Sequence, residues 1–240
     1  MSEYIMGKNT IAEVLKYKEN HIIEVFTSKE RNDPLIQEFL KKNIPIRFVN
    51  KSMLTSMVKS ESHQNIVAKT KSRNYFDLKE FLNLMDKKSS SVVLMLDSIY
   101  DPQNLGSILR SSECFSCDGV VFSKNRGSDI TPVVTKAAAG ATELLNLIKV
   151  SNLATTIDGF IEHGYSILAT TLDSDAKDIT SFEFTDKSLI IMGSEGEGIQ
   201  PILLKKSDYK IHIPMTGKLQ SLNVAQATAV ILSYMKFTRK

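Results

Sequence analysis

The hydrophobic and polar positions of the chain follow two patterns. Short apolar runs, such as those from Val92 to Leu96 and from Leu189 to Met192, are too short to form helices. Uninterrupted apolar runs of this length are typical of strands that are buried on both faces of a parallel sheet. Longer helix-like segments lie between these runs.

This alternation is clearest after residue 91. The predicted strands are residues 92–97, 119–122, 147–150, 165–170, 189–193 and 209–213. Strands that alternate with helices predict an α/β fold in which helices cover both faces of a parallel sheet. The final segment, residues 222–237, is apolar on most faces and predicts a buried helix.

The N-terminal third predicts a smaller α/β unit. Its helix-like segments are residues 9–17, 34–42 and 51–58, and its strand-like segments are residues 22–26, 46–49 and 65–68. Asp33 and Pro34 form a favourable helix start, because Asp caps a helix and Pro suits its first position. Polar residues then surround one short amphipathic stretch, which is typical of a linker. We therefore expect a small domain at residues 1–73, a linker at 74–91 and a larger domain at 92–240.

The composition is that of an ordinary globular protein, with 240 residues of which 42% are hydrophobic. No stretch approaches the roughly 18 apolar residues of a membrane span. The start of the chain also lacks a basic region followed by an apolar one, which a secretory signal would have. We expect a cytoplasmic protein that does not contact a membrane.

The net charge of +3 is unevenly distributed. Residues 1–75 hold 13 Lys and Arg against 8 Asp and Glu, whereas residues 76–240 hold 17 against 19. A basic domain joined to a nearly neutral one suits a phosphate-binding module that serves a catalytic module. The alternative is a basic surface that is merely solvated.

The two cysteines, Cys114 and Cys117, have the C-x-x-C spacing of redox and zinc sites. A structural zinc site needs four ligands, and no second Cys or His pair lies nearby in the sequence. We therefore expect two unpaired thiols at the end of a helix, in a reducing compartment, and no bound metal.

Three polar or glycine-rich islands each follow a predicted strand. They are residues 101–106 (DPQNLG), residues 193–198 (GSEGEG), and Ile213 to Met215 leading into Ser221, Leu222 and Asn223. In open α/β sheets, ligands bind where the strands end at their carboxyl edge. The islands are therefore candidates for one site.

In order and spacing, the three islands resemble the motifs of the SpoU-TrmH family of RNA ribose 2′-O-methyltransferases, which belong to the knotted SPOUT class. Residues 5–10 (IMGKNT) and 63–68 (HQNIVA) resemble the family's N-terminal substrate-binding domain, which is L30e/L7Ae-like. The resemblance implies a deep trefoil knot in the methyltransferase domain, a homodimer that completes the site, and S-adenosyl-L-methionine as cofactor.

The resemblance also implies roles for individual residues. Asn104, Arg110, Glu195, Ser221 and Asn223 match catalytic-centre positions. The cofactor would lie against Gly193, Ile213 and Leu222, with Thr170 and Met215 close by. On a helix, Arg110 would lie nearly two turns beyond Asn104, and we expect the two side chains to face one cleft. Because a guanidinium is almost never neutral, we expect Arg110 to position a phosphate and stabilise developing alkoxide charge rather than act as a base.

Two of these islands have alternative interpretations. Residues 193–198 have the form of a dinucleotide-binding loop, but such fingerprints occur in the first strand-turn-helix unit, not near the end of a domain. Ser221 precedes an apolar helical run, so capping that helix is an equally good role for it. Glu197 matches no catalytic position and is expected to be a solvated loop charge.

The substrate is indicated by residues 136–143 (KAAAGATE), which resemble the 23S rRNA guanosine enzymes of the family, whereas many tRNA-directed relatives have serine at Ala138. Ser116 stands where glycine is common, which weakens the expected turn. We expect methyl transfer to a guanosine ribose 2′-oxygen in 23S rRNA. The alternatives are a tRNA guanosine 2′-O-methyltransferase and a non-catalytic RNA-binding assembly factor.

Overall fold

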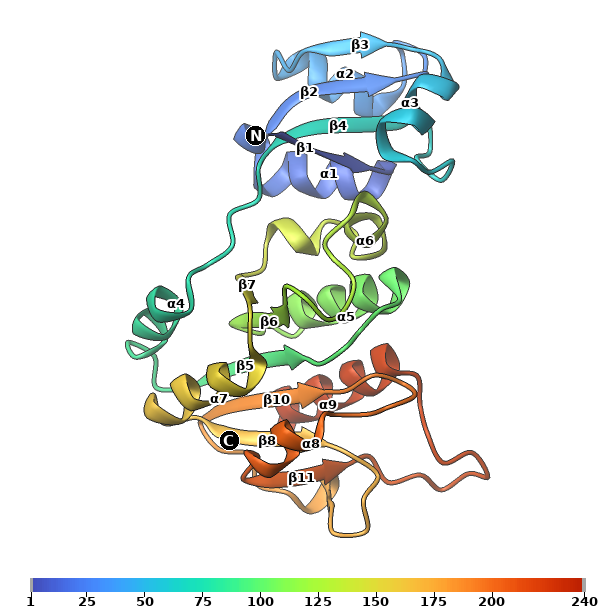
Figure 1. The fold of residues 1–240 in the computed structure, drawn as a ribbon. Coiled ribbons are helices and arrows are strands. Elements are labelled where there is room, and N and C mark those ends of the chain that lie inside the picture. Colours follow the sequence, from blue (N-terminus) through green and yellow to red (C-terminus); the bar gives the residue numbers. More distant parts are fainter. Residues whose placement is uncertain (1, 239–240) are drawn as a thin grey trace. The chain divides into compact units, whose positions relative to one another are not determined.

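The computed structural model describes residues 2–238 and divides into two compact units. One unit comprises residues 1–74 with residues 130–144, and the other comprises residues 75–129 with residues 145–240. The larger unit contains a seven-stranded sheet in the order β7-β6-β5-β10-β8-β11-β9, with every neighbouring pair parallel (Figure 1). The predicted parallel α/β fold is therefore confirmed for this unit.

The strands of this sheet agree closely with the sequence pattern. They are β5 (Ser91–Leu96), β6 (Gly119–Ser123), β7 (Leu147–Val150), β8 (Ser166–Thr170), β9 (Lys177–Asp178), β10 (Lys187–Met192) and β11 (Tyr209–His212). All six predicted strands are present, and only the two-residue β9 was missed. Such a short strand has too few residues to show a hydrophobic pattern.

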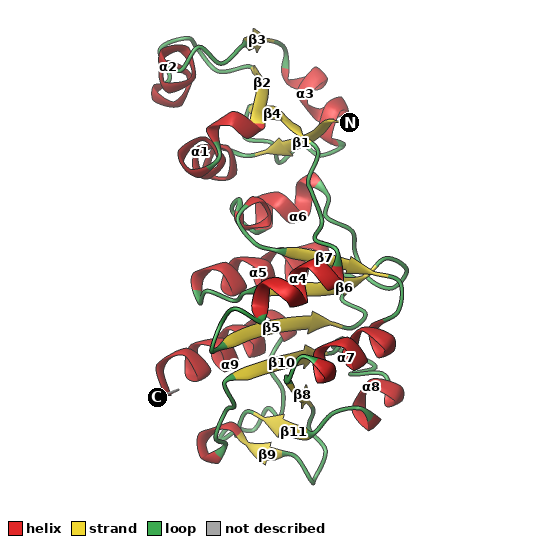
Figure 2. Cartoon of the chain, turned by 90° about the vertical axis from the view of Figure 1, so that its left-hand side faces the viewer, coloured by secondary structure: helices red, strands yellow, loops and turns green. Residues whose placement is uncertain are grey.

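Helices cover both faces of this sheet. Figure 2 shows α5 (Pro102–Cys114) and α9 (Val224–Thr238) on one face, and α7 (Leu153–Glu162) and α8 (Pro201–Lys205) on the other. Phe160, Phe81 and Leu203 belong to one buried cluster with strand residues such as Ile167 and Ile191. Since alternate strand residues point to opposite faces, the intervening residues face α5 and α9.

The smaller unit contains a four-stranded sheet in the order β1-β4-β2-β3. Its elements are β1 (Ser2–Met6), α1 (Lys8–Tyr17), β2 (Ile22–Thr27), α2 (Pro34–Lys41), β3 (Ile46–Phe48), α3 (Lys51–Val58) and β4 (Ile66–Lys71). The Asp33 side chain caps α2 by accepting from the Leu35 N–H at 3.0 Å, as predicted. The strand β1 was not predicted, although it pairs along its length with β4.

The domain boundaries differ from the expected ones in two places. The segment expected to be a linker carries α4 (Leu78–Met85), whose Phe81, Leu82 and Met85 are buried in the core of the larger unit. Its amphipathic pattern therefore reflects core packing.

The second difference is that residues 130–144, expected in the larger domain, belong to the smaller unit. There the carboxylate of Glu143 pairs with Arg73 and with His21, and both Arg73 and Glu143 are almost fully buried. The α6 helix (Pro132–Ala137) contributes Val133 to a cluster with Met6 and Leu54. Burial and a paired charge thus attach this segment to the N-terminal sheet.

Candidate active site

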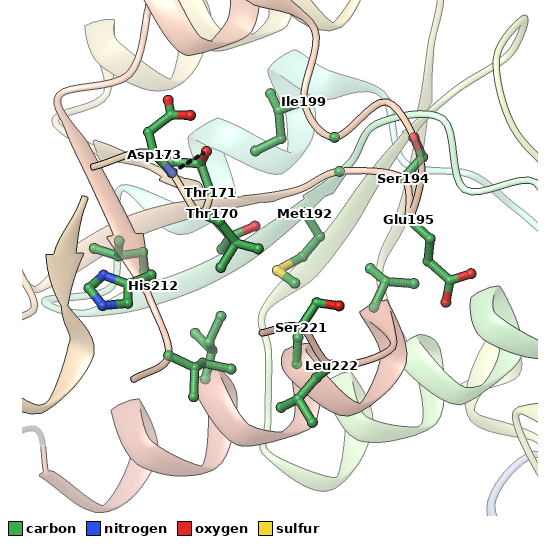
Figure 3. Close-up of a pocket in the computed structure, with 18 of the residues that line it drawn as sticks. Thr170, Thr171, Asp173, Met192, Ser194, Glu195, Ile199, His212, Ser221 and Leu222 are labelled. Carbon is green, nitrogen blue, oxygen red and sulfur yellow. Dashed lines mark hydrogen bonds between the residues drawn. The ribbon is translucent and has the colours of Figure 1, made fainter. Parts of the chain in front are cut away.

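A cavity of about 420 Å³ lies at the carboxyl ends of β8, β10 and β11 in the larger unit. The five expected cofactor-binding residues all line it: Thr170, Gly193, Ile213, Met215 and Leu222. In Figure 3, Thr170 and Met192 lie across the cavity from Ser221 and Leu222. The sheet thus brings the end of β8 and two of the three islands, residues 193–198 and 213–223, to one cavity.

The glycine-rich loop after β10 forms one wall of this cavity. Ser194 and Gly198 exchange two backbone hydrogen bonds of 3.1 Å, and the Glu197 N–H donates to the Ser194 hydroxyl at 3.3 Å. A Cβ atom at Gly193 would lie 2.6 Å from the Gly198 carbonyl oxygen, so a side chain cannot be accommodated there. Gly198 itself has a positive φ of 69°. The loop therefore depends on glycine at both ends.

Three expected catalytic residues meet at the edge of the cavity. The Asn104 side-chain amide donates to Glu195 Oε1 at 3.1 Å, and the Asn223 amide donates to Asn104 Oδ1 at 3.0 Å and also to Glu195 Oε1. Hydrogen bonds to a carboxylate are stronger than neutral ones and hold its orientation. This Asn104–Glu195–Asn223 triangle places one carboxylate at a fixed position beside the cavity.

Arg110 is not brought to this triangle. It lies on α5, is exposed, and lines neither the cavity nor the adjoining hollow described below. The expectation that Asn104 and Arg110 face one cleft is therefore not met by the structure of a single chain. Six residues at about 100 degrees each place Arg110 roughly 120 degrees from Asn104 around the helix axis and nearly two turns further along it.

Ser221 does line the cavity, but it does not cap the last helix. Asn223 performs the capping, because its Oδ1 accepts from the Ala225 N–H at 2.9 Å. The alternative capping role of Ser221 is therefore wrong. The final helix also has an exposed side, with Val230 40% and Phe237 78% exposed, so it is buried on one face only.

A second hollow adjoins the cavity and shares Glu195 with it. It is further lined by Ser98, Tyr100, Asp101, Asn104, Arg126 and Glu197. Sequence analysis did not select Tyr100 or Arg126, because neither belongs to a motif. The position of Tyr100 just after a predicted strand was the available signal.

Asp97 is another residue that the sequence analysis missed. Its fully buried carboxylate accepts from the Gln200 N–H and from the Gln200 side-chain amide, both at 2.7 Å. Gln200 lies two residues after the glycine-rich loop, and the Asp97 N–H donates to the Met192 carbonyl, which precedes that loop. Asp97 therefore holds both ends of the loop against β5.

The cavity fits an organic cofactor. Its volume is in the range of small-molecule sites, and its walls combine apolar side chains such as Ile199 and Val224 with loop backbone. The carboxylate of Asp173, also in the wall, accepts a hydrogen bond from Lys210 that lowers its pKa. Within residues 2–238, no group of three or more His, Cys, Asp or Glu side chains is arranged to hold a metal ion.

A cavity at the carboxyl edge of a parallel sheet, beside converging polar side chains, defines a ligand-binding α/β protein. Two family models narrow this class: the SpoU rRNA Methylase family matches residues 91–233, and the RNA 2′-O ribose methyltransferase substrate-binding family matches residues 4–76. The chain therefore belongs to the SpoU rRNA methylase family, as its motifs indicated.

Relatives of known function match over nearly the whole chain. The 23S rRNA (guanosine-2′-O-)-methyltransferase RlmB of Haemophilus ducreyi is 34% identical over 97% of this chain and 96% of its own length. The protein of the same name from Yersinia pestis is 33% identical, with the same coverage of both chains.

Solved structures support the fold. The SpoU methyltransferase AviRb from Streptomyces viridochromogenes has a TM-score of 0.82 and 20% identity, covering 99% of this chain and 90% of its own. An AdoMet-bound rRNA methyltransferase from Sinorhizobium meliloti has a TM-score of 0.78 and 19% identity, with coverages of 100% and 88%. In the part of the chain that the structure describes, no helix has the length and apolar character needed to cross a membrane.

Proposed function

We propose that the protein transfers the methyl group of S-adenosyl-L-methionine to the ribose 2′-oxygen of a guanosine in 23S rRNA. The observation that carries this proposal is the adjacency of two features. The cavity lined by all five expected cofactor residues shares Glu195 with the Asn104–Glu195–Asn223 triangle. The names of the full-length relatives supply the substrate.

Gly193, Ile213 and Leu222 would hold the cofactor, with Thr170 and Met215 beside it. When bound, the cofactor supplies an electrophilic methyl group on its sulfonium. The Thr170 hydroxyl donates to the Ile191 carbonyl at 2.8 Å, so we assign Thr170 a packing role rather than a polar one. With the cofactor and RNA bound, the apolar part of the walls would exclude water from the reacting atoms, which strengthens the polar interactions there.

The triangle would orient the ribose hydroxyl. Glu195 Oε1 already accepts from both asparagines, which leaves its second oxygen to accept from a 2′-hydroxyl. Asn223 is fixed at the same time by capping α9. Ser221, whose side chain lies beside Leu222 at the cavity wall, would also contact the substrate. Holding the oxygen in line with the methyl group contributes much of the rate in such a displacement.

We assign Arg110 the role of binding a phosphate of the RNA backbone. Its exposed position on α5 leaves its guanidinium accessible to a phosphate. Replacing Arg110 with Ala is expected to abolish methyl transfer while cofactor affinity stays within about threefold, because Arg110 does not line the cavity. Isothermal titration with S-adenosylmethionine measures the cofactor affinity. The rate of methyl transfer by Arg110→Lys is expected to lie between those of the native protein and Arg110→Ala. Loss of cofactor binding in Arg110→Ala would contradict this role.

The function is tested by incubating the protein with a tritiated methyl donor and separate 23S rRNA and tRNA pools. We expect label in 23S rRNA, released by nuclease digestion as 2′-O-methylguanosine. Label confined to tRNA would establish the tRNA alternative, for which a TrmH/SpoU tRNA modifying enzyme from A. aeolicus, with a TM-score of 0.56 over 66% of this chain, is the structural precedent. Binding of RNA without label in either pool would establish a non-catalytic assembly factor.

The smaller unit, with residues 1–73 as its sequence-predicted extent, is proposed as the RNA substrate-binding domain. Its family model carries that description, and its net charge is positive. Residues 92–240 are proposed as the SPOUT methyltransferase domain. Because ribosomal RNA is cytoplasmic, the reaction is proposed to take place there, without a metal and without membrane contact.

We further propose a homodimer and a trefoil knot, as the family resemblance implies. The exposed Phe237 and Val230 on α9, with Leu219 82% exposed, supply apolar surface that a second copy would cover. Sedimentation equilibrium at micromolar concentration is expected to give twice the chain mass. The knot would be formed by the chain from about Leu189 to α9, and an experimental structure in which that segment threads no loop would exclude it.

A further inference from the structure

The second hollow has a lining that suits a base rather than a phosphate chain. It holds three carboxylates, Asp101, Glu195 and Glu197, against a single guanidinium, Arg126. A predominantly acidic lining disfavours a polyanion. It favours a ligand edge that presents hydrogen-bond donors.

Two of the three carboxylates already have partners. Glu195 accepts from the two asparagines of the triangle, and Asp101 caps α5 by accepting from the Gln103 N–H at 2.6 Å. For Glu197, no hydrogen bond or ion pair of the side chain occurs with any residue from 2 to 238, while its backbone N–H is fixed by the Ser194 hydroxyl at 3.3 Å. The backbone of Glu197 is therefore held in place, while its carboxylate is available to accept hydrogen bonds from a ligand.

The same hollow has an aromatic wall. Tyr100 is 61% exposed and makes no ring contact with another described residue, so its face is open to solvent. It lies four residues before Asn104, on the segment that enters α5. Exposed aromatic faces next to reactive sites are the usual means of stacking an unpaired RNA base.

We propose that this hollow is the subsite for the target base, with Tyr100 stacking on the base and Glu197 recognising guanine. This inference rests on the proposed function. A carboxylate in line with the Watson–Crick edge of guanine accepts from both N1–H and the 2-amino group, whereas adenine presents an acceptor at N1. The base would then lie beside the triangle that orients its own ribose. Arg126, whose Nε donates to Ser98 Oγ at 3.4 Å, has further donors for the adjoining phosphate.

The test measures base discrimination by the full-length protein. After the modified position is mapped, transcripts that carry guanosine, inosine or adenosine at that position are methylated at saturating cofactor. For Glu197→Gln, kcat/KM with guanosine is expected to fall about tenfold to a hundredfold, and the preference for guanosine over inosine and adenosine is expected to shrink with it. Because Glu197 also lines the cofactor cavity, the ratio between bases is the decisive quantity.

Matched variants separate the two roles. Glu162→Gln changes an exposed glutamate of α7 that lines neither hollow, and it is expected to behave like the native protein. Tyr100→Ala is expected to lower kcat/KM about tenfold or more for all three bases, whereas Tyr100→Phe keeps the stacking face and most of the activity.

The outcomes distinguish this inference from the proposed function. If the native protein methylates no RNA, the proposed function itself fails. If it methylates guanosine but Glu197→Gln keeps the native base ratios, Glu197 does not read the base. Equal activity of Tyr100→Ala and Tyr100→Phe would remove the stacking role.

Discussion

At the scale of single residues, the site is built from side chains that serve two purposes. Asn223 caps α9 and also donates to Glu195, so the same amide fixes the start of a helix and the position of a carboxylate. Asp97 likewise ties the end of β5 to Gln200 beyond the glycine-rich loop. Substituting either residue would therefore change both local structure and the geometry of the site.

His63 shows how burial sets the protonation of a residue outside the active site. It is 3% exposed, its Nδ1 accepts from the Asn65 N–H at 3.0 Å, and Nε2 lies 3.2 Å from the Thr55 hydroxyl. Burial of the imidazole is the main cause that lowers the pKa of His63 below 6.5. The positive charges of Lys51 and Lys136 lower this pKa further. Thus His63 is a packed residue of the smaller unit that resists protonation.

A pH dependence of stability follows from this shift. Below about pH 6.5 the unfolded chain takes up a proton that folded His63 resists, so the free energy of unfolding falls as the pH is lowered through that value. Urea unfolding at about pH 7.5 and about pH 5.5 measures the change. The His63→Gln variant has no such group, and it is expected to lose less stability over the same interval. An equal loss in both proteins would contradict the shifted pKa.

At the scale of elements, the turn that ends α5 has a serine, Ser116, at a position where glycine would be more stable. Ser116 has a φ of 57°, and its N–H bonds the Glu113 carbonyl while the Cys117 N–H bonds the Ser112 carbonyl. These two bonds form a Schellman motif, in which glycine is favoured at the left-handed position. The serine therefore imposes backbone strain on this turn. This agrees with the expectation that a serine at position 116, where glycine is common in the family, weakens the turn.

Ser116→Gly is expected to raise the free energy of unfolding by about 0.5 to 1 kcal/mol, because glycine adopts a positive φ without steric cost. Ser107→Gly, at an exposed position inside the same helix, is the matched control. It is expected to lower stability by about 0.5 kcal/mol, since glycine is a poor helix residue. Chemical denaturation of both variants measures the effects, and a destabilised Ser116→Gly would contradict the strain.

At the scale of the whole molecule, the two proposed functions belong to two units of different net charge. RNA binding is proposed for the smaller unit and methyl transfer for the larger one. Adding residues 130–144 to the smaller unit brings one Lys and one Glu, so its net charge of +5 is unchanged. Deleting residues 1–75 would also remove the partners of α6, such as Met6 and Leu54. Substitutions of exposed lysines are therefore a cleaner test of RNA binding than a truncation.

Lys8→Gln with Lys51→Gln, two exposed positions of the smaller unit, is expected to weaken RNA binding. The dependence of log affinity on log salt concentration should become less steep by about 0.7 to 0.9 for each phosphate that the variant no longer neutralises. Filter binding to 23S rRNA over a range of salt concentrations measures the slope. Lys79→Gln with Lys205→Gln, exposed in the larger unit, controls for charge alone. Identical slopes in the two double variants would show that the basic excess is incidental.

The sequence by itself determined the local elements, and its resemblance to a known family named candidate residues for the cavity. Apolar runs located six of the seven strands in the larger sheet, and the five cofactor-binding residues that the family resemblance implies all line the cavity. The strands could be located because strand periodicity depends on neighbours in sequence. The carboxyl edge of such a sheet is also where ligands bind, and two of the islands lie there.

Only the tertiary structure decided which distant segments meet. Asn223 reaches Asn104 across 119 residues of chain, residues 130–144 join the smaller unit, and Arg110 stays outside both hollows. The second hollow, with Tyr100 and Glu197, was likewise invisible to sequence patterns. Such contacts arise from the packing of buried surfaces and the pairing of buried charges, which hydrophobic periodicity does not record.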